Sequence, residues 1–191
     1  MTSSHQQKTP LILPFMGPFY DRVAAPLSHL GLRVLVGAML IIEGWPKIQA
    51  PFAMAGFTES LGMYPGWFWS LVLAVLQFVG GVMILAGFLT RPMALANGVM
   101  LAVTFWFHWA FPYGDLALTP EGIAAAQAAG QTLFTEDGLR NLASDGGAVF
   151  LHQVQFKAEG LSALWTVAAL FLAAWGAGPL SVDRSILNRE F

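Results

Sequence analysis

Two charged residues close a stretch of the sequence that is otherwise strongly apolar. Residues 41–48 read IIEGWPKI, which places Glu43 and Lys47 at the end of a run of Leu, Val, Ala, Gly and Met. Inside a bilayer each such charge costs about 2.5–3.5 kcal/mol near the helix centre. A Glu four residues before a Lys can form an ion pair on one helix face. The two side chains could hold and move protons, or form an intrahelical pair at the level of the lipid headgroups.

Other polar groups occur in the remaining apolar runs at helical spacing. The ones that could exchange protons or hydrogen bonds are Gln77, His108, His152 and Glu159. Helices that alternate in direction would bring the ionisable ones to the level of Glu43 and Lys47, and such groups normally face a bundle interior or a wet cavity. Two simpler interpretations stay open. His108 lies in FWFHWAF and could belong to an interfacial aromatic belt, and His152 could precede the membrane.

Carboxylate and imidazole groups are also the ligand types of an iron, manganese or zinc site. No closely spaced motif such as Glu-x-x-His supports such a site, so we assign no metal ligands. The sequence has no cysteine, which excludes a disulfide and a thiolate metal site. Any redox role must therefore use other groups.

The composition is that of a membrane protein. The 191 residues are 56% hydrophobic and 10% charged, against roughly 25% charged residues in soluble domains. The formal net charge is −2 and no cluster of Lys and Arg is present, so nothing favours nucleic-acid binding. The N-terminal segment has a short apolar patch interrupted by Pro10, Pro14 and Pro18, and we expect no cleaved signal peptide.

Four segments are long and apolar enough to cross about 30 Å of hydrocarbon. They are residues 27–48, 67–89, 93–111 and 150–176. We therefore predict an all-α fold, an integral membrane four-helix bundle in one domain that covers residues 1–191, with 1–26 as an N-terminal segment. The short TRP connection at residues 90–92 makes the second and third spans antiparallel neighbours, with Pro92 in the first turn.

The distribution of Lys and Arg predicts the orientation. Six of these residues lie on one side of the predicted spans and three on the other, which places both termini in the cytoplasm. The long connection over residues 112–149 then lies on the outer face, and we expect it to be partly helical. Its expected helix starts are Thr119-Pro120-Glu121 and Thr135-Glu136-Asp137. It is either a cap over the bundle or a surface on which a partner docks.

Several pieces of the sequence, taken in order, resemble the DoxX family of small four-span membrane proteins. RVLVGAMLIIEGWPKI is similar to the family's opening pattern, and Arg33, Gly37, Gly44 and Lys47 match it. The pieces AGFTESLGMYP, QFVGGVMILAGFLTRPMALA and GAGPLSVDRSI follow it. The resemblance covers residues 28–111 and 155–186. Glu43 stands where the family often has His, Gln77 stands where it often has Glu, and the connection over 112–149 is longer than in the family core.

The resemblance implies a multi-pass protein of the bacterial cytoplasmic (inner) membrane that is associated with redox work. We therefore expect a membrane subunit of a quinone-linked redox system that binds quinone or a similar lipophilic partner near the outer leaflet. The expected partner protein is a membrane or periplasmic redox protein, with possible homo- or hetero-oligomers. Quinone is the expected cofactor, because a quinone carbonyl needs hydrogen-bond donors and a proton source. The expected catalytic residues are Glu43 and His108. The expected quinone-binding residues are Arg33, Trp45, Lys47, Gln77, His152 and Glu159.

Two other functions remain open from the sequence. The first is a structural or assembly subunit of a larger membrane complex, in which the polar residues only stabilise the bundle. The second is a small-solute carrier, which the absence of an internal repeat disfavours.

Overall fold

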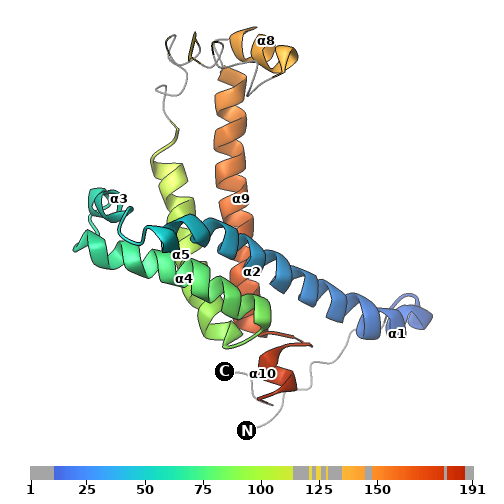
Figure 1. The fold of residues 1–191 in the computed structure, drawn as a ribbon. Coiled ribbons are helices and arrows are strands. Elements are labelled where there is room, and N and C mark those ends of the chain that lie inside the picture. The colour runs from blue at the N-terminus through green and yellow to red at the C-terminus, as the bar shows by residue number, and fades with distance from the viewer. Residues whose placement is uncertain are drawn as a thin grey trace. The chain divides into compact units, whose positions relative to one another are not determined.

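The computed structural model describes residues 11–113, 121, 124–125, 128, 135–144, 148–178 and 180–187. Within these ranges all regular structure is helical, and four helices are long and apolar enough to cross a membrane. Figure 1 shows the helices in chain order. The predicted all-α class with four spans is confirmed, whereas the cytoplasmic location of both termini stays a prediction.

The four long helices agree with the predicted spans to within a few residues at most ends. They are α2 (Ala25–Gln49), α4 (Gly66–Ala86), α5 (Thr90–Ala110) and α9 (Ala148–Trp175). Pro92 is the third residue of α5, in the first turn, where its missing N–H does no harm. Apolar length was therefore sufficient to locate the spans.

The chain is helical across Pro14 and Pro18, in the N-terminal segment to which the sequence assigned no helix. The chain is helical from Pro14 onward through η1 (Pro14–Met16), α1 (Gly17–Phe19) and the π-helical turn η2 (Tyr20–Ala24) into α2. The hydrogen bonds adjust to the prolines: the Gly17 N–H donates to the carbonyl of Pro14, and the Ala25 N–H donates five residues back to Tyr20. The 3₁₀ turn and the π turn accommodate the prolines, which have no backbone N–H.

The chain divides into two compact units, which are described separately. One contains residues 1–93 and 174–191, and the other contains residues 94–173. In the first unit α2 packs on α4. Glycines allow the close approach: a Cβ on Gly37 would lie 2.8 Å from the N atom of Leu85, and one on Gly44 would lie 2.6 Å from that of Phe78. The side chains of Leu40 and Ile84 are completely buried.

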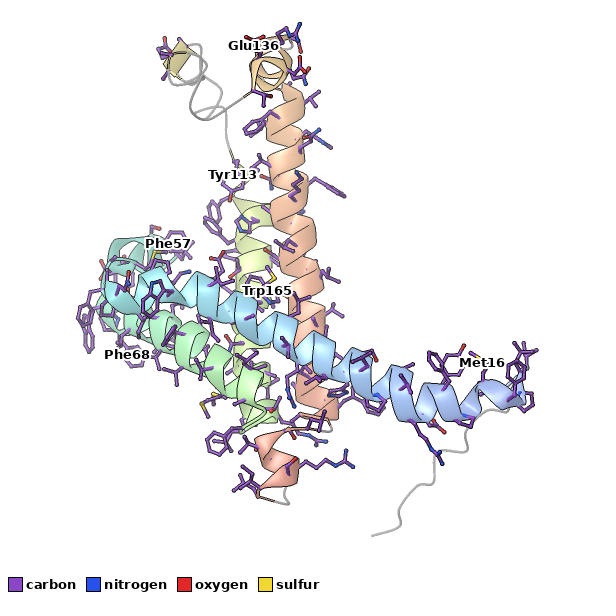
Figure 2. The ribbon with its side chains drawn as sticks, turned by 45° about the vertical axis from the view of Figure 1, so that its right-hand side comes forward. Met16, Phe57, Phe68, Tyr113, Glu136 and Trp165 are labelled. Atoms are coloured by element: carbon purple, nitrogen blue, oxygen red, sulfur yellow. The ribbon has the colours of Figure 1, made fainter. Side chains whose placement is uncertain are left out.

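Two short helices complete the first unit. Helix α3 (Ala55–Ser60) packs on the start of α4, where the Thr58 hydroxyl donates to the carbonyl of Gly66 and the Gly66 N–H donates to Glu59 Oε1. Helix α10 (Val182–Ser185) is capped at its N-terminus by Ser181, whose hydroxyl accepts from the Arg184 N–H. Figure 2 labels Phe57 in α3 and Phe68 near the start of α4.

The second unit contains most of α5 and α9, together with the short helix α8 (Glu136–Ser144). Helix α8 confirms the helix start that was predicted at Thr135, whose hydroxyl accepts from the Gly138 N–H at 3.1 Å. The other predicted start, at Thr119-Pro120, lies outside the described residues. The connection between the third and fourth spans is therefore partly helical, as expected.

Replacing Gly44 by Ala tests the close packing of α2 on α4. The new Cβ would overlap the backbone of Phe78, so we expect the free energy of unfolding to fall by about 1–3 kcal/mol. The matched control is Gly31→Ala in the same helix, where a Cβ meets nothing within 4 Å. The control should stabilise by up to about 1 kcal/mol through helix propensity. Titration with a denaturing detergent in mixed micelles measures both changes, and equal effects of the two substitutions would contradict the packing.

Candidate functional site

Glu43 and Lys47 pair with each other inside α2. Their charged atoms Oε2 and Nζ are 3.7 Å apart, and Lys47 Nζ also donates to the Glu43 carbonyl at 2.9 Å. The Lys47 side chain is 22% exposed and the Glu43 side chain is 56% exposed. The pair lies in the last two turns of α2, which ends at Gln49. Glu43 thus has a charge partner and is still accessible from outside its unit.

Gln77 is a buried polar residue of α4, near the part of α2 that carries this pair. A Cβ on Gly44 would lie 2.9 Å from the carbonyl carbon of Gln77, so Gln77 lies beside the turn that carries Glu43. Gln77 is only 8% exposed, and its Oε1 accepts no hydrogen bond from the described residues. A buried acceptor without a donor is unfavourable by about 1–3 kcal/mol. A small ligand with a hydroxyl or N–H group would satisfy it.

Trp45 lies on α2 between Glu43 and Lys47 in the sequence and contacts α4. Its ring centroid is 5.5 Å from that of Phe78, the residue after Gln77. Trp45 is 53% exposed. An aromatic surface and a buried amide acceptor therefore occur on the same part of the α2–α4 crossing.

Arg33 lies ten residues before Glu43, about 15 Å along the helix at 1.5 Å per residue. It is 3% exposed, and its Nη1 and Nη2 donate to the carbonyls of Ala177 and Leu180, both at 2.8 Å. In the same part of the unit, His29 Nε2 lies 2.8 Å from the carbonyl oxygen of Gly176. The Arg33 guanidinium is thus held by the C-terminal segment.

Asp183 completes this buried arrangement and was missed in the sequence analysis. Its carboxylate accepts from the N–H groups of Leu89 at 2.9 Å and Thr90 at 3.1 Å, so it caps the N-terminus of α5. Its negative charge also acts on Arg33. We call Arg33, Asp183, Thr90 and the carbonyls of Ala177 and Leu180 the Arg33 network.

The backbone at Gly87 allows the C-terminal segment to approach. Gly87 has a φ of 74° and ends α4, and its carbonyl accepts from the Asp183 N–H at 2.9 Å. A Cβ here would lie 2.5 Å from the Cβ of Ser181 and 2.8 Å from Arg33 Nη1. The piece of sequence that could have pointed to Asp183 is GAGPLSVDRSI. In it the acidic residue follows Gly and Pro residues that interrupt the apolar pattern.

In the second unit Gln155 joins α9 to the end of α5. Its Nε2 donates to the His108 carbonyl at 2.7 Å and to Glu159 Oε1, and its Oε1 accepts from the Tyr113 N–H at 2.9 Å. Figure 2 labels Tyr113 where α5 ends beside α9. The imidazole of His108 is half-buried against the Tyr113 ring, with the centroids 5.7 Å apart. His152 is exposed.

The structure therefore brings together some of the predicted site residues. Glu43 pairs with Lys47 in the first unit, and Gln155 links the His108 backbone to Glu159 in the second. That all of these groups form one site stays a prediction, because the two units are described separately. Among the described residues, no three His, Asp or Glu side chains gather in a way that could hold a metal ion.

Replacing Asp183 by Ala tests the Arg33 network. The substitution leaves two amides without an acceptor and removes the opposite charge from a buried guanidinium, so we expect a loss of about 3–5 kcal/mol in the free energy of unfolding. Arg184→Gln changes the charge of the exposed neighbouring residue and should stay within about 0.5 kcal/mol of the parent. A loss at Asp183 no larger than at Arg184, measured in mixed micelles, would contradict the proposed role.

Comparison with known proteins points to the same family as the sequence motifs. The DoxX family model matches residues 28–109. The inner membrane protein YqjF of Escherichia coli (strain K12) is 40% identical over 83 residues, which are 43% of this chain and 62% of YqjF. The match thus spans less than two thirds of that relative. No solved structure matches the chain.

The family match covers α2 to α5 and confirms the resemblance over these residues. The resemblance in the C-terminal segment lies outside the match. The relative's name and the four apolar helices confirm the expected location in the inner membrane. Residues 28–109 are therefore similar to the DoxX family, and they lie within a chain that has four helices long and apolar enough to cross a membrane.

Proposed function

We propose that this protein is a membrane subunit of a quinone-linked redox system and that it binds a quinone headgroup at the α2–α4 crossing. The observation that carries the proposal is the Oε1 of Gln77, a buried acceptor without a donor among the described residues. A hydroquinone has two hydroxyl donors, and one of them would satisfy this atom. The residues present thus fit the group in the chemistry of their donors and acceptors.

The side chains around Gln77 support the same assignment. The half-exposed carboxylate of Glu43 can exchange a proton with a ligand, and the Lys47 Nζ lies 3.7 Å from its Oε2. The exposed ring of Trp45 offers an apolar face. A bound quinone supplies two-electron, two-proton redox chemistry, whereas this chain supplies the hydrogen bonds and a proton-exchanging carboxylate.

The electrons must come from a partner. The sequence has no cysteine for an iron–sulfur cluster and shows no flavin or haem motif. We therefore propose a membrane or periplasmic redox protein as partner. His108, the other expected catalytic residue, lies in the second unit, and its role stays a prediction.

One observation favours the second candidate, a structural or assembly subunit. The ion pair of Glu43 and Lys47 is complete within α2 and needs no ligand to be neutral. Under this function Glu43→Gln would change the stability of the protein without changing any redox activity of the complex.

The quinone proposal is tested by the gently purified protein and its Gln77→Leu variant. Organic extraction followed by mass spectrometry should find near-stoichiometric quinone in the parent and at least a tenfold loss in the variant, which corresponds to about 1.4 kcal/mol of binding free energy. Gln153→Leu, at an exposed position of α9, is the matched control and should retain the quinone.

The variant also separates binding from folding. Leu removes an unsatisfied acceptor, so Gln77→Leu should unfold at the same or a higher denaturant concentration in quinone-free preparations. Absence of quinone from the parent, or full retention in Gln77→Leu, would contradict the site. Co-purifying membrane proteins without quinone would instead indicate the structural subunit.

A further inference from the structure

The first membrane-spanning helix is longer than a bilayer. The helical chain from Pro14 to Gln49 has 36 residues, or about 54 Å at 1.5 Å per residue. The hydrocarbon layer is about 30 Å thick. A straight helix of this length would fit only at a tilt of about 56°, beyond the 0–40° found for membrane helices. One end must therefore leave the hydrocarbon or bend.

The N-terminal end is the one that lies away from the packing of α2 on α4. Gly37, Leu40 and Gly44 of α2 are buried, whereas residues 14–24 make their main contacts with the adjacent helical segments of the same chain. In Figure 1 α1 continues α2 away from α4, and Figure 2 shows Met16 near the tip of this extension. We call residues 14–24 the N-terminal extension.

The extension carries apolar side chains at a spacing of four residues. Phe15, Phe19 and Val23 are 74%, 48% and 47% exposed, and Leu27 continues the row into α2 at 64%. Asp21, two residues after Phe19, lies on the opposite face of the helix, whereas Arg22, three residues after Phe19, borders the row. A row of exposed apolar side chains, with an acidic residue opposite and a basic residue whose long side chain can reach the headgroups, is typical of helices that lie in the membrane surface.

The bilayer is the nearest apolar surface to this row, because α2 itself crosses it. We propose that the N-terminal extension lies along the membrane surface, with Phe15, Phe19 and Val23 in the headgroup layer. The π-helical turn η2 forms the end of the extension next to α2 and gives a place for the bend. Tyr20 in this turn suits the same layer, because its ring is apolar and its hydroxyl is polar.

The absence of cysteine allows a direct test by site-directed spin labelling. Single variants Phe19→Cys and Asp21→Cys are labelled in the full chain in vesicles of phosphatidylethanolamine and phosphatidylglycerol. Leu164→Cys, at a 68% exposed position within α9, serves as the hydrocarbon reference. Relaxation by oxygen measures contact with lipid, and relaxation by a water-soluble nickel chelate measures contact with water.

We expect the oxygen-to-nickel ratio to be several-fold higher at residue 19 than at residue 21, and lower at residue 19 than at residue 164. Equal ratios at 19 and 21 with strong nickel relaxation would overturn the proposal, because the extension would then lie in water. Shielding of residue 19 from both reagents would overturn it in favour of a protein partner or a second copy. A ratio at 19 equal to that at 164 would place the extension in the hydrocarbon and would also overturn it.

Discussion

The burial of the Arg33 guanidinium constrains the first unit more than any other interaction. A permanent positive charge inside a membrane-spanning helix is tolerated only when its donors are satisfied and an opposite charge is near. The C-terminal segment supplies acceptors for Nη1 and Nη2 through the carbonyls of Ala177 and Leu180, and the carboxylate of Asp183 supplies the opposite charge. Because Asp183 also caps α5, one buried arrangement joins the first helix, the turn after α4 and the end of the chain.

The second constraint is the close approach of α2 and α4. Gly37 and Gly44 remove side chains from the contact, so the backbones approach until a Cβ at either glycine would overlap the other helix. The same approach buries Gln77 and leaves Glu43, Lys47 and Trp45 at the margin of the contact. The features that we assign to quinone binding thus follow from the close packing of two membrane helices. Small residues at the contact bring the two backbones together.

Much of the fold could be predicted because apolar length and helical spacing act locally. The four spans, the pairing of Glu43 with Lys47 and the cap at Thr135 each depend on residues within a few turns of one another. The electrostatic interaction of Asp183 with Arg33 could not be predicted, since the two residues lie 150 positions apart in the sequence and the approach of the C-terminal segment depends on the backbone at Gly87. The helical path through Pro14 and Pro18 was also missed, because it uses 3₁₀ and π turns that apolar periodicity does not reveal.

The central claim is that Arg33 and Asp183 act as one unit. A double-mutant cycle with Arg33→Met and Asp183→Asn, measured as free energies of unfolding in mixed micelles, tests it most directly. We predict that the double variant loses less stability than the sum of the single variants, with a coupling of at least about 1 kcal/mol. Additive losses, within about 0.5 kcal/mol, would show that the two side chains act independently and would contradict the account.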